Sequence, residues 1–153
     1  MNDVSGAGDT VPSPHPRLPS EASMALLAER SVWRAMWNGL RSRCPSCGTG
    51  GLFDGFIRVS DACPHCGEAL HHHRADDAPP YIVMMIVGHV VVAIMLLYEI
   101  TMSPALWLHA AIFLPLTVLM SLILMRPTKG ALVGLQWANL MHGFDPEYAG
   151  GDV

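Results

Sequence analysis

The sequence predicts an all-α membrane protein: a two-helix transmembrane hairpin with a small cytoplasmic four-cysteine, zinc-ribbon-like head and flanking amphipathic helices. Three observations predict this fold class. Two apolar stretches of twenty residues each lie in the second half of the 153-residue chain. Before them, four cysteines, the whole complement of the chain, form two Cys-Pro-x-Cys-Gly motifs. All nine arginines and lysines lie outside the short connection between the two apolar stretches.

The N-terminal part of the chain is predicted to be a disordered tail followed by one amphipathic helix. Residues 1–19 are rich in proline, glycine and polar residues, a composition typical of disorder. Residues 20–41 are predicted to form a helix capped by Ser20, because apolar and basic residues recur at helical spacing. One interpretation places this helix on the inner membrane surface, where its arginines meet anionic headgroups. The other packs it against the cysteine-containing segment, with Trp33 and Trp37 as its core.

Residues 42–70 contain both cysteine pairs and are predicted to form the zinc-ribbon-like head. The four predicted ligands are Cys44, Cys47, Cys63 and Cys66. Thiolates two residues apart can bind one metal ion from a tight turn, and a second pair completes a tetrahedral zinc site. Four thiolates leave no coordination position for water, so the predicted Zn²⁺ is structural and no enzyme activity is predicted. A short hairpin between the pairs is expected to cover the metal with four apolar side chains: Leu52, Phe53, Phe56 and Ile57.

Residues 71–80 are predicted to be a linker between the head and the membrane. Three consecutive histidines, His71 to His73, lie next to a zinc motif and suggest a further metal site. Consecutive side chains point in different directions on a helix or strand, so regular structure allows at most two of them on one ion. The alternative is a polar linker at the level of the lipid headgroups, in which the histidines pair with Asp76 and Asp77.

The two apolar stretches are predicted to be transmembrane helices. Residues 81–100 carry one carboxylate, Glu99, and residues 106–125 carry no formal charge. Each stretch would be about 30 Å long as a helix, which matches the hydrocarbon thickness of a bilayer. Residues 101–105 form the predicted outer loop. Because this loop contains no lysine or arginine, the positive-inside rule places both termini in the cytoplasm.

Ionisable residues in the predicted spans are candidate functional groups. His89 lies near the middle of the first span, at the depth of Thr117 in the second, and a hydrogen bond between them is one interpretation. Glu99 and His109 lie at similar heights near the outer face, where they could form an ion pair. The alternative is that His89 simply joins the two helices and Glu99 simply reaches the outer headgroups.

The C-terminal residues are predicted to form an interfacial helix and a tail. Arg126, Pro127 and Gly130 predict a break in the chain at the inner interface. Residues 126–143 carry apolar positions at three- and four-residue steps, which favours a helix lying along the membrane surface. Residues 144–153 are predicted to be a solvent-exposed tail.

Short motifs along most of the chain carry a family resemblance. They are Arg43-Cys-Pro-Ser-Cys-Gly48, Gly51-Leu-Phe53, Cys63-Pro-His-Cys66, Gly88-His-Val-Val91, Glu99, Pro104-x-x-Trp107-x-His109, Pro115-Leu116, Arg126-Pro-x-Lys-Gly130 and Gly134-Leu-Gln-Trp137. In combination, from about Trp33 to Phe144, they resemble the bacterial domain-of-unknown-function 983 family. The resemblance implies a small inner-membrane protein with a zinc-ribbon-like head. It also implies a link to haem-copper oxidase subunits and assembly factors, whose genes lie near those of such proteins in some proteobacteria.

Two classes of function fit these features. In the first, a non-enzymatic inner-membrane protein uses its zinc head to dock membrane-protein partners, such as respiratory complex subunits or assembly factors. In the second, a metal- or haem-handling factor uses His89, Glu99 and His109. The net charge of −4 argues against nucleic-acid binding. Two spans bury little surface against each other, so self-association or incorporation into a larger complex is also expected.

Overall fold

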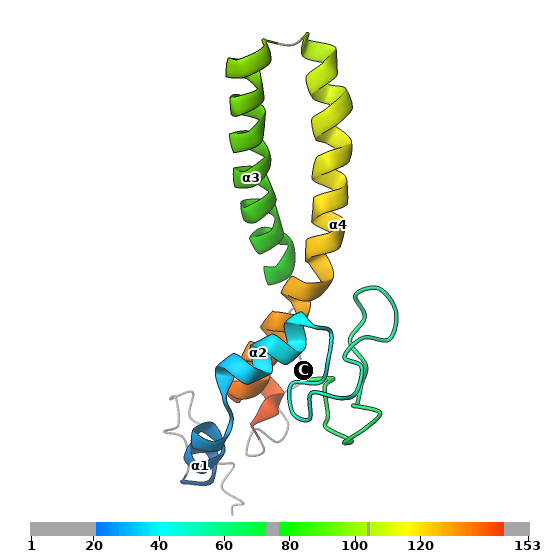
Figure 1. Ribbon diagram of the computed structural model, residues 1–153. Helices are drawn as coiled ribbons and strands as arrows, with labels where there is room; N and C mark the ends of the chain where they lie inside the picture. The colour runs from blue at the N-terminus through cyan, green and yellow to red at the C-terminus, as the bar shows by residue number, and fades with distance from the viewer. Residues whose placement is uncertain (1–20, 73–76, 104, 146–153) are drawn as a thin grey trace, which may run out of the picture.

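The structure is a computed structural model that describes residues 21–72, 77–103 and 105–145. It is mostly helical, with helices α1 (Glu21–Glu29), α2 (Val32–Leu40), α3 (Ala78–Met102) and α4 (Leu106–Ala138) and a short 3-10 helix, η1 (His142–Phe144). Figure 1 shows α3 and α4 as a long hairpin, with α2 crossing the C-terminal part of α4. The predicted tail 1–19 lies outside the described residues.

Helices α3 and α4 are both long and apolar enough to cross a membrane. In their most apolar windows only 17% and 6% of the residues are buried within the protein. The core helix of a soluble protein buries its apolar face, so these two helices need another apolar environment to cover them. The 33 residues of α4 span about 50 Å, which exceeds the roughly 30 Å of bilayer hydrocarbon. Part of α4 therefore extends beyond any membrane that it crosses.

One seam of apolar residues holds α3 against α4. Val83, Val87 and Val91 recur every four residues and therefore share one face of α3, where they are buried together with Phe113 of α4. Six partly buried side chains extend the seam: Met95, Tyr98, Leu116, Met120, Leu124 and Met125. Most of the other large apolar side chains between Tyr81 and Ile123 of the two helices are exposed.

Helix α3 is longer than predicted at both ends. Pro79 and Pro80 belong to its first turn, where the missing N–H groups cost no helical hydrogen bond. The helix continues to Met102, and Ser103 ends it in a left-handed conformation with φ of 43°. The predicted outer loop, residues 101–105, therefore begins inside the helix.

The break predicted after the second span does not occur. Residues 126–138 continue α4 through Pro127, so the prediction of a separate helix over residues 126–143 is wrong. A proline inside a helix removes one hydrogen bond. Here the packing of this part of α4 against α2 and the head compensates, because Gly130 and Trp137 are buried.

The single helix predicted over residues 20–41 is also wrong, because the chain forms two helices. α1 ends at Glu29 and α2 begins at Val32. Between them Ser31 is extended and caps α2, since its Oγ accepts a hydrogen bond from the Arg34 N–H at 3.4 Å. Because Ser31 takes an extended conformation to cap α2, α1 cannot continue through it.

Small residues allow α2 and α4 to touch at their backbones. A Cβ added to Gly39 would collide with the carbonyl of Gly130, and one added to Gly134 would collide with the carbonyl of Ala35. Each helix therefore presents two small residues, four positions apart, to the other. This spacing places both small residues on one helix face, which lets the helix axes approach closely.

The tryptophans of α2 do not form its core, contrary to one of the two interpretations of this segment. Trp33 and Trp37 are 77% and 44% exposed, and their rings stack with centroids 6.5 Å apart. The guanidinium carbon of Arg41 lies 4.7 Å from the centroid of the Trp37 ring. Helix α2 therefore contacts α4 through its small residues and presents an aromatic face outward.

The head, residues 42–70, is irregular and packs onto α4. Its three isolated β-bridges join Arg43 with Gly51, Phe53 with Val59, and Ala62 with Ala69. Its core consists of Cys44, Leu52, Val59, Cys63, Leu70 and Val133 of α4. Of the four side chains predicted to cover the metal, Leu52 is fully buried and Phe53 partly buried. Phe56 and Ile57 are 54% and 41% exposed at the end of a loop, so the prediction is wrong for these two.

The first residues of the predicted C-terminal tail belong to the fold. Phe144 is buried, in one cluster with Ala35 and Trp137. The Ser23 hydroxyl of α1 donates a hydrogen bond to the Asp145 carboxylate at 3.1 Å. Residues 146–153 lie outside the described part of the chain.

We expect Gly130→Ala to destabilise the protein by roughly 1–3 kcal/mol, because the added Cβ would collide with the carbonyl of Gly39. Gly88→Ala is the matched control, since Gly88 also lies in a long helix but has open space around it. There alanine should be neutral or stabilising by up to about 1 kcal/mol. Thermal unfolding of detergent-solubilised protein measures both changes. Equal stability of the two variants would show that the close crossing does not hold α2.

Candidate metal centre

The four cysteines come from two turns with the same local geometry. In each motif the glycine N–H donates to the carbonyl of the first cysteine: Gly48 to Cys44 at 2.9 Å, and Gly67 to Cys63 at 3.0 Å. The two glycines have φ of 71° and 74°, a conformation that residues with a side chain rarely adopt. The glycine therefore lets each turn fold back so that both of its sulfurs face the same point.

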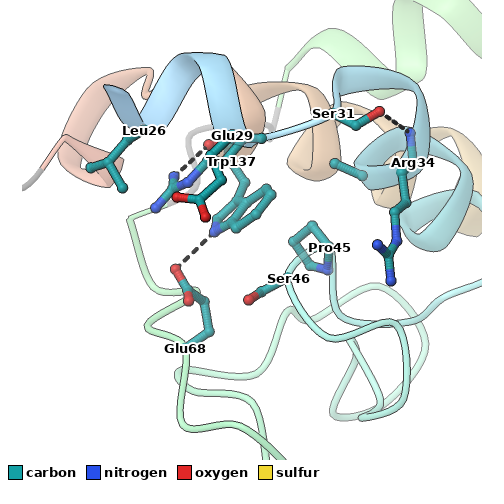
Figure 2. Close-up of a pocket in the computed structure, with 10 residues that line it drawn as sticks. Leu26, Glu29, Ser31, Arg34, Pro45, Ser46, Glu68 and Trp137 are labelled. Atoms are coloured by element: carbon teal, nitrogen blue, oxygen red, sulfur yellow. Dashed lines mark hydrogen bonds between the residues drawn. The ribbon is translucent and has the colours of Figure 1, made fainter. Parts of the chain in front are cut away.

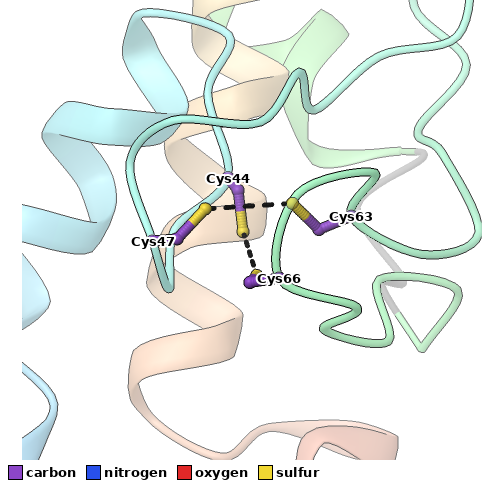
Figure 3. A group of neighbouring side chains, drawn as sticks. All are labelled: Cys44, Cys47, Cys63 and Cys66. Atoms are coloured by element: carbon purple, nitrogen blue, oxygen red, sulfur yellow. Dashed lines mark hydrogen bonds between the residues drawn. The ribbon is translucent and has the colours of Figure 1, made fainter.

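The four sulfur atoms lie within 4.8 Å of one another (Figure 3). The Cys44 and Cys66 sulfurs are 3.8 Å apart, and the Cys47 and Cys63 sulfurs are 3.9 Å apart. Four sulfurs about 2.3 Å from a central zinc ion would be separated by about 3.8 Å in a regular tetrahedron. The group could therefore hold one metal ion, with two ligands from each turn.

Hydrogen bonds and burial shift the pKa values of three of these thiols in opposite directions. Backbone hydrogen bonds from Gly50 and Thr49 lower the pKa of Cys47 to about 6. Burial raises the pKa of Cys44 and of Cys66. A metal ion that binds near neutral pH must therefore displace protons from Cys44 and Cys66, whereas Cys47 is already a thiolate.

Gly50, which follows the first turn, determines how closely the two turns approach. A Cβ at this position would collide with the sulfur of Cys63. The Gly50 carbonyl also accepts a hydrogen bond from the Cys44 N–H at 2.8 Å. The sequence analysis did not identify this residue, because it lies outside the two Cys-Pro-x-Cys-Gly motifs. Its contact is with the opposite turn and leaves no local pattern.

Trp137 connects the second cysteine turn to α4 (Figure 2). Its indole Nε1 donates a hydrogen bond to Oε1 of Glu68 at 2.8 Å. Nη1 of Arg30 donates a hydrogen bond to the Trp137 carbonyl at 2.8 Å. The guanidinium carbon of Arg30 lies 4.2 Å from the centroid of the Trp137 ring. These side chains border a cleft of about 410 Å³ between the head and the start of α2. Sequence reasoning missed the set, because its members are far apart in the chain.

Glu99 and His109 lie in contact where α3 ends and α4 begins. Nε2 of His109 is 3.2 Å from Oε2 of Glu99. The imidazole stacks on Phe113 with centroids 5.9 Å apart, and it meets Tyr98 edge-on at 5.8 Å. Nδ1 of His109 is buried and has no hydrogen-bond partner among the described residues.

His89 is not part of that contact, and the interpretation in which it bonds to Thr117 is wrong. Nδ1 of His89 lies 2.7 Å from the carbonyl oxygen of Met85, one turn earlier in α3. The Thr117 hydroxyl donates to the Phe113 carbonyl at 2.6 Å. Both side chains thus bond within their own helices, and His89 is exposed on the outside of the hairpin.

Two of the three consecutive histidines are described. The rings of His71 and His72 lie with centroids 3.9 Å apart, and His72 meets Phe144 edge-on at 5.9 Å. Neither belongs to the cysteine group. His73 and Asp76 lie outside the described residues, and so does the part of the predicted pairing that involves them.

A family model matches residues 53–137, which is more than half of the chain. Its description is "Protein of unknown function (DUF983)". The chain belongs to the DUF983 family. The match contains the second cysteine pair, α3 and all but the last residue of α4. It begins after the first cysteine pair, whereas the resemblance in the sequence began earlier, at about Trp33. No curated protein and no solved structure matches the chain.

For this DUF983 protein we expect Cys44→Ser or Cys66→Ser to abolish metal binding and to unfold the head. The reason is that a head of this size depends on metal binding for much of its folding free energy. Ser46→Ala is the control, because it alters the same turn without removing a sulfur. Elemental analysis of the purified proteins should find about one metal ion per chain in the wild type and the control. Unchanged metal content in the cysteine variants would exclude this centre.

Proposed function

We propose that this protein is an integral protein of the bacterial inner membrane that uses a structural zinc head to dock partner proteins. The single observation that carries the proposal is the exposed, stacked pair Trp33 and Trp37 on a helix that packs against α4 and is hydrogen-bonded to the head through Asn38. The partners we propose are membrane proteins, namely respiratory oxidase subunits or assembly factors. The family resemblance supports this choice of partner.

The exposed apolar surface of the hairpin supports a membrane location. Large side chains on the outer faces of α3 and α4, such as Leu97, Leu114 and Ile123, are exposed. A surface of this extent is stable only against lipid or against another apolar surface. Arg126 and Lys129 follow the span of α4, whereas the described residues between the two helices carry no charge, which favours cytoplasmic termini.

The donor set supports zinc as the metal. Four cysteine sulfurs within 4.8 Å of one another suit Zn²⁺, and the reducing cytoplasm would keep the thiols free of disulfides. Bound there, zinc would supply structural cross-linking, because four thiolates leave no position for a substrate or for water. The protein we propose therefore acts without catalysis.

The aromatic face of α2 has the chemistry of a protein interface. Tryptophan and arginine are the residue types most enriched where binding energy is concentrated, and here Arg41 lies over the ring of Trp37. The contact of Gly39 with Gly130 holds α2 in place. A partner would therefore meet a preformed surface and would lose little conformational entropy in ordering it.

The docking proposal predicts that Trp33→Ser combined with Trp37→Ser abolishes partner recovery and leaves the metal content unchanged. Each tryptophan should contribute on the order of tenfold or more to affinity, if both are central to the interface. Crosslinking in native membranes, followed by affinity purification and mass spectrometry, measures recovery. Trp107→Ser is the matched control, because Trp107 is about as exposed as Trp33 but lies at the opposite end of the hairpin. Undiminished recovery of oxidase-related partners by the double variant would refute docking through α2.

A second candidate function is metal or haem handling by the intramembrane residues. It is supported by the contact between Glu99 and His109 and by the unpartnered Nδ1 of His109 within the described chain. His89 lies about 15 Å from Glu99 along α3 and does not contribute to that pair. His89→Ala and His109→Ala distinguish the two functions in the same preparations. Docking predicts unchanged partner recovery, and metal or haem handling predicts loss of a bound metal or haem in addition to the cysteine-bound ion.

A further inference from the structure

Loop 54–58 of the head carries two apolar side chains that the fold does not cover. The Asp54 N–H donates to the Arg58 carbonyl at 2.8 Å and closes the loop. Between these residues Phe56 and Ile57 are exposed, and neither belongs to the buried core of the head. An aromatic and a β-branched aliphatic side chain therefore stand together at the end of a small, closed turn.

The turn projects away from the rest of the head. Gly55 has φ of 106°, and a Cβ added to it would meet no atom within 4 Å. The bridge between Phe53 and Val59 fixes the base of the loop. The position of the loop is thus set by the head rather than by contacts of its own tip.

The base of the loop lies beside the inner end of the apolar hairpin. The guanidinium carbon of Arg126 is 5.3 Å from the ring centroid of Phe53. Arg126 directly follows the apolar stretch of α4 and is the type of residue that marks the inner membrane interface. Phe56 is three residues from Phe53, so at most about 10 Å of chain separates them. Figure 1 shows this loop extending from the head toward the level at which α3 begins.

We propose that loop 54–58 inserts Phe56 and Ile57 into the interfacial region of the inner lipid leaflet. The proposal rests on the proposed membrane location of the hairpin. Aromatic and aliphatic side chains on a surface next to a membrane partition into the boundary between headgroups and acyl chains. Because Asp54 balances the charge of Arg58, the apolar pair rather than net charge drives the insertion.

Lipid fits this loop better than a protein partner does. Two side chains on a five-residue turn offer far less area than a stable protein interface requires. A lipid surface needs no shape complementarity, and the hairpin already holds the head beside it. The insertion would attach the head to the bilayer at a second point, in addition to its packing on α4. It would thereby orient the aromatic face of α2 relative to the bilayer.

The test uses the full-length, metal-loaded protein in lipid nanodiscs. A fluorescent non-canonical amino acid replaces Phe56 in one variant and Ile57 in a second, so that the result does not depend on one substitution. His65, exposed in the second cysteine turn, is the matched head position, and Leu119, exposed near the middle of α4, is the reference for the membrane interior. Lipids that carry a nitroxide near the headgroup or deep in the acyl chain quench each label according to its depth.

We expect shallow nitroxides to quench the labels at Phe56 and Ile57 severalfold more strongly than the label at His65. Loop labels quenched no more than His65, with Leu119 quenched by deep nitroxides, would overturn the loop proposal and leave the membrane location intact. An unquenched label at Leu119 would overturn both. Loop labels shielded from a water-soluble quencher but not quenched by lipid would also overturn the proposal, in favour of contact with a second copy of the chain.

Discussion

Because α4 continues unbroken from Leu106 to Ala138, the helix that packs against α3 at one end also packs against α2 and the head at the other. The C-terminal part of α4 contacts α2 through some residues and the head through others. Gly130 and Gly134 admit the backbone of α2, and Val133 fills the core of the head. Trp137 bonds to the second cysteine turn through Glu68. This one helix therefore positions α2, α3 and the head, which itself has no regular secondary structure.

The head has a small apolar core and four cysteines that could hold a metal ion. Its apolar core comprises few residues, two of which are the cysteines Cys44 and Cys63. A core of that size buries too little apolar surface to offset the conformational entropy lost by some thirty ordered residues. A metal ion held by two like turns would join the two halves of the head, and Val133 extends the core into a helix that is already formed. Metal binding at the cysteines and packing on α4 would therefore stabilise the same small volume.

The features that could be predicted from the sequence are those that depend on residues close together in the chain. Cysteine spacing predicted the grouping of Cys44, Cys47, Cys63 and Cys66, and uniform apolarity predicted both long helices. The errors arose where tertiary contacts override local signals. Pro127 is a strong local signal for a break, but packing against α2 keeps the helix intact. Trp33 and Trp37 suggested a buried face of α2, but both are exposed. The face of α2 that packs on α4 carries Ala35 and Gly39 instead, because only small residues allow the two backbones to touch. Gly50 and Glu68 act on residues distant in the chain, which no spacing rule detects.

The aromatic face and the metal centre are physically connected through α2. An isolated helix of nine residues is unstable in water, so the exposed tryptophans are ordered only because α2 is held at both its face and its end. Its face rests on Gly130, and its C-terminal end leads within a few residues to Cys44, where Asn38 Nδ2 donates to the Pro45 carbonyl at 3.5 Å. Stabilising the cysteine turns therefore stabilises the end of α2. By linkage, if a metal ion at the cysteines raised the affinity of α2 for a partner by some factor, the partner would raise the affinity of the cysteines for the metal by the same factor.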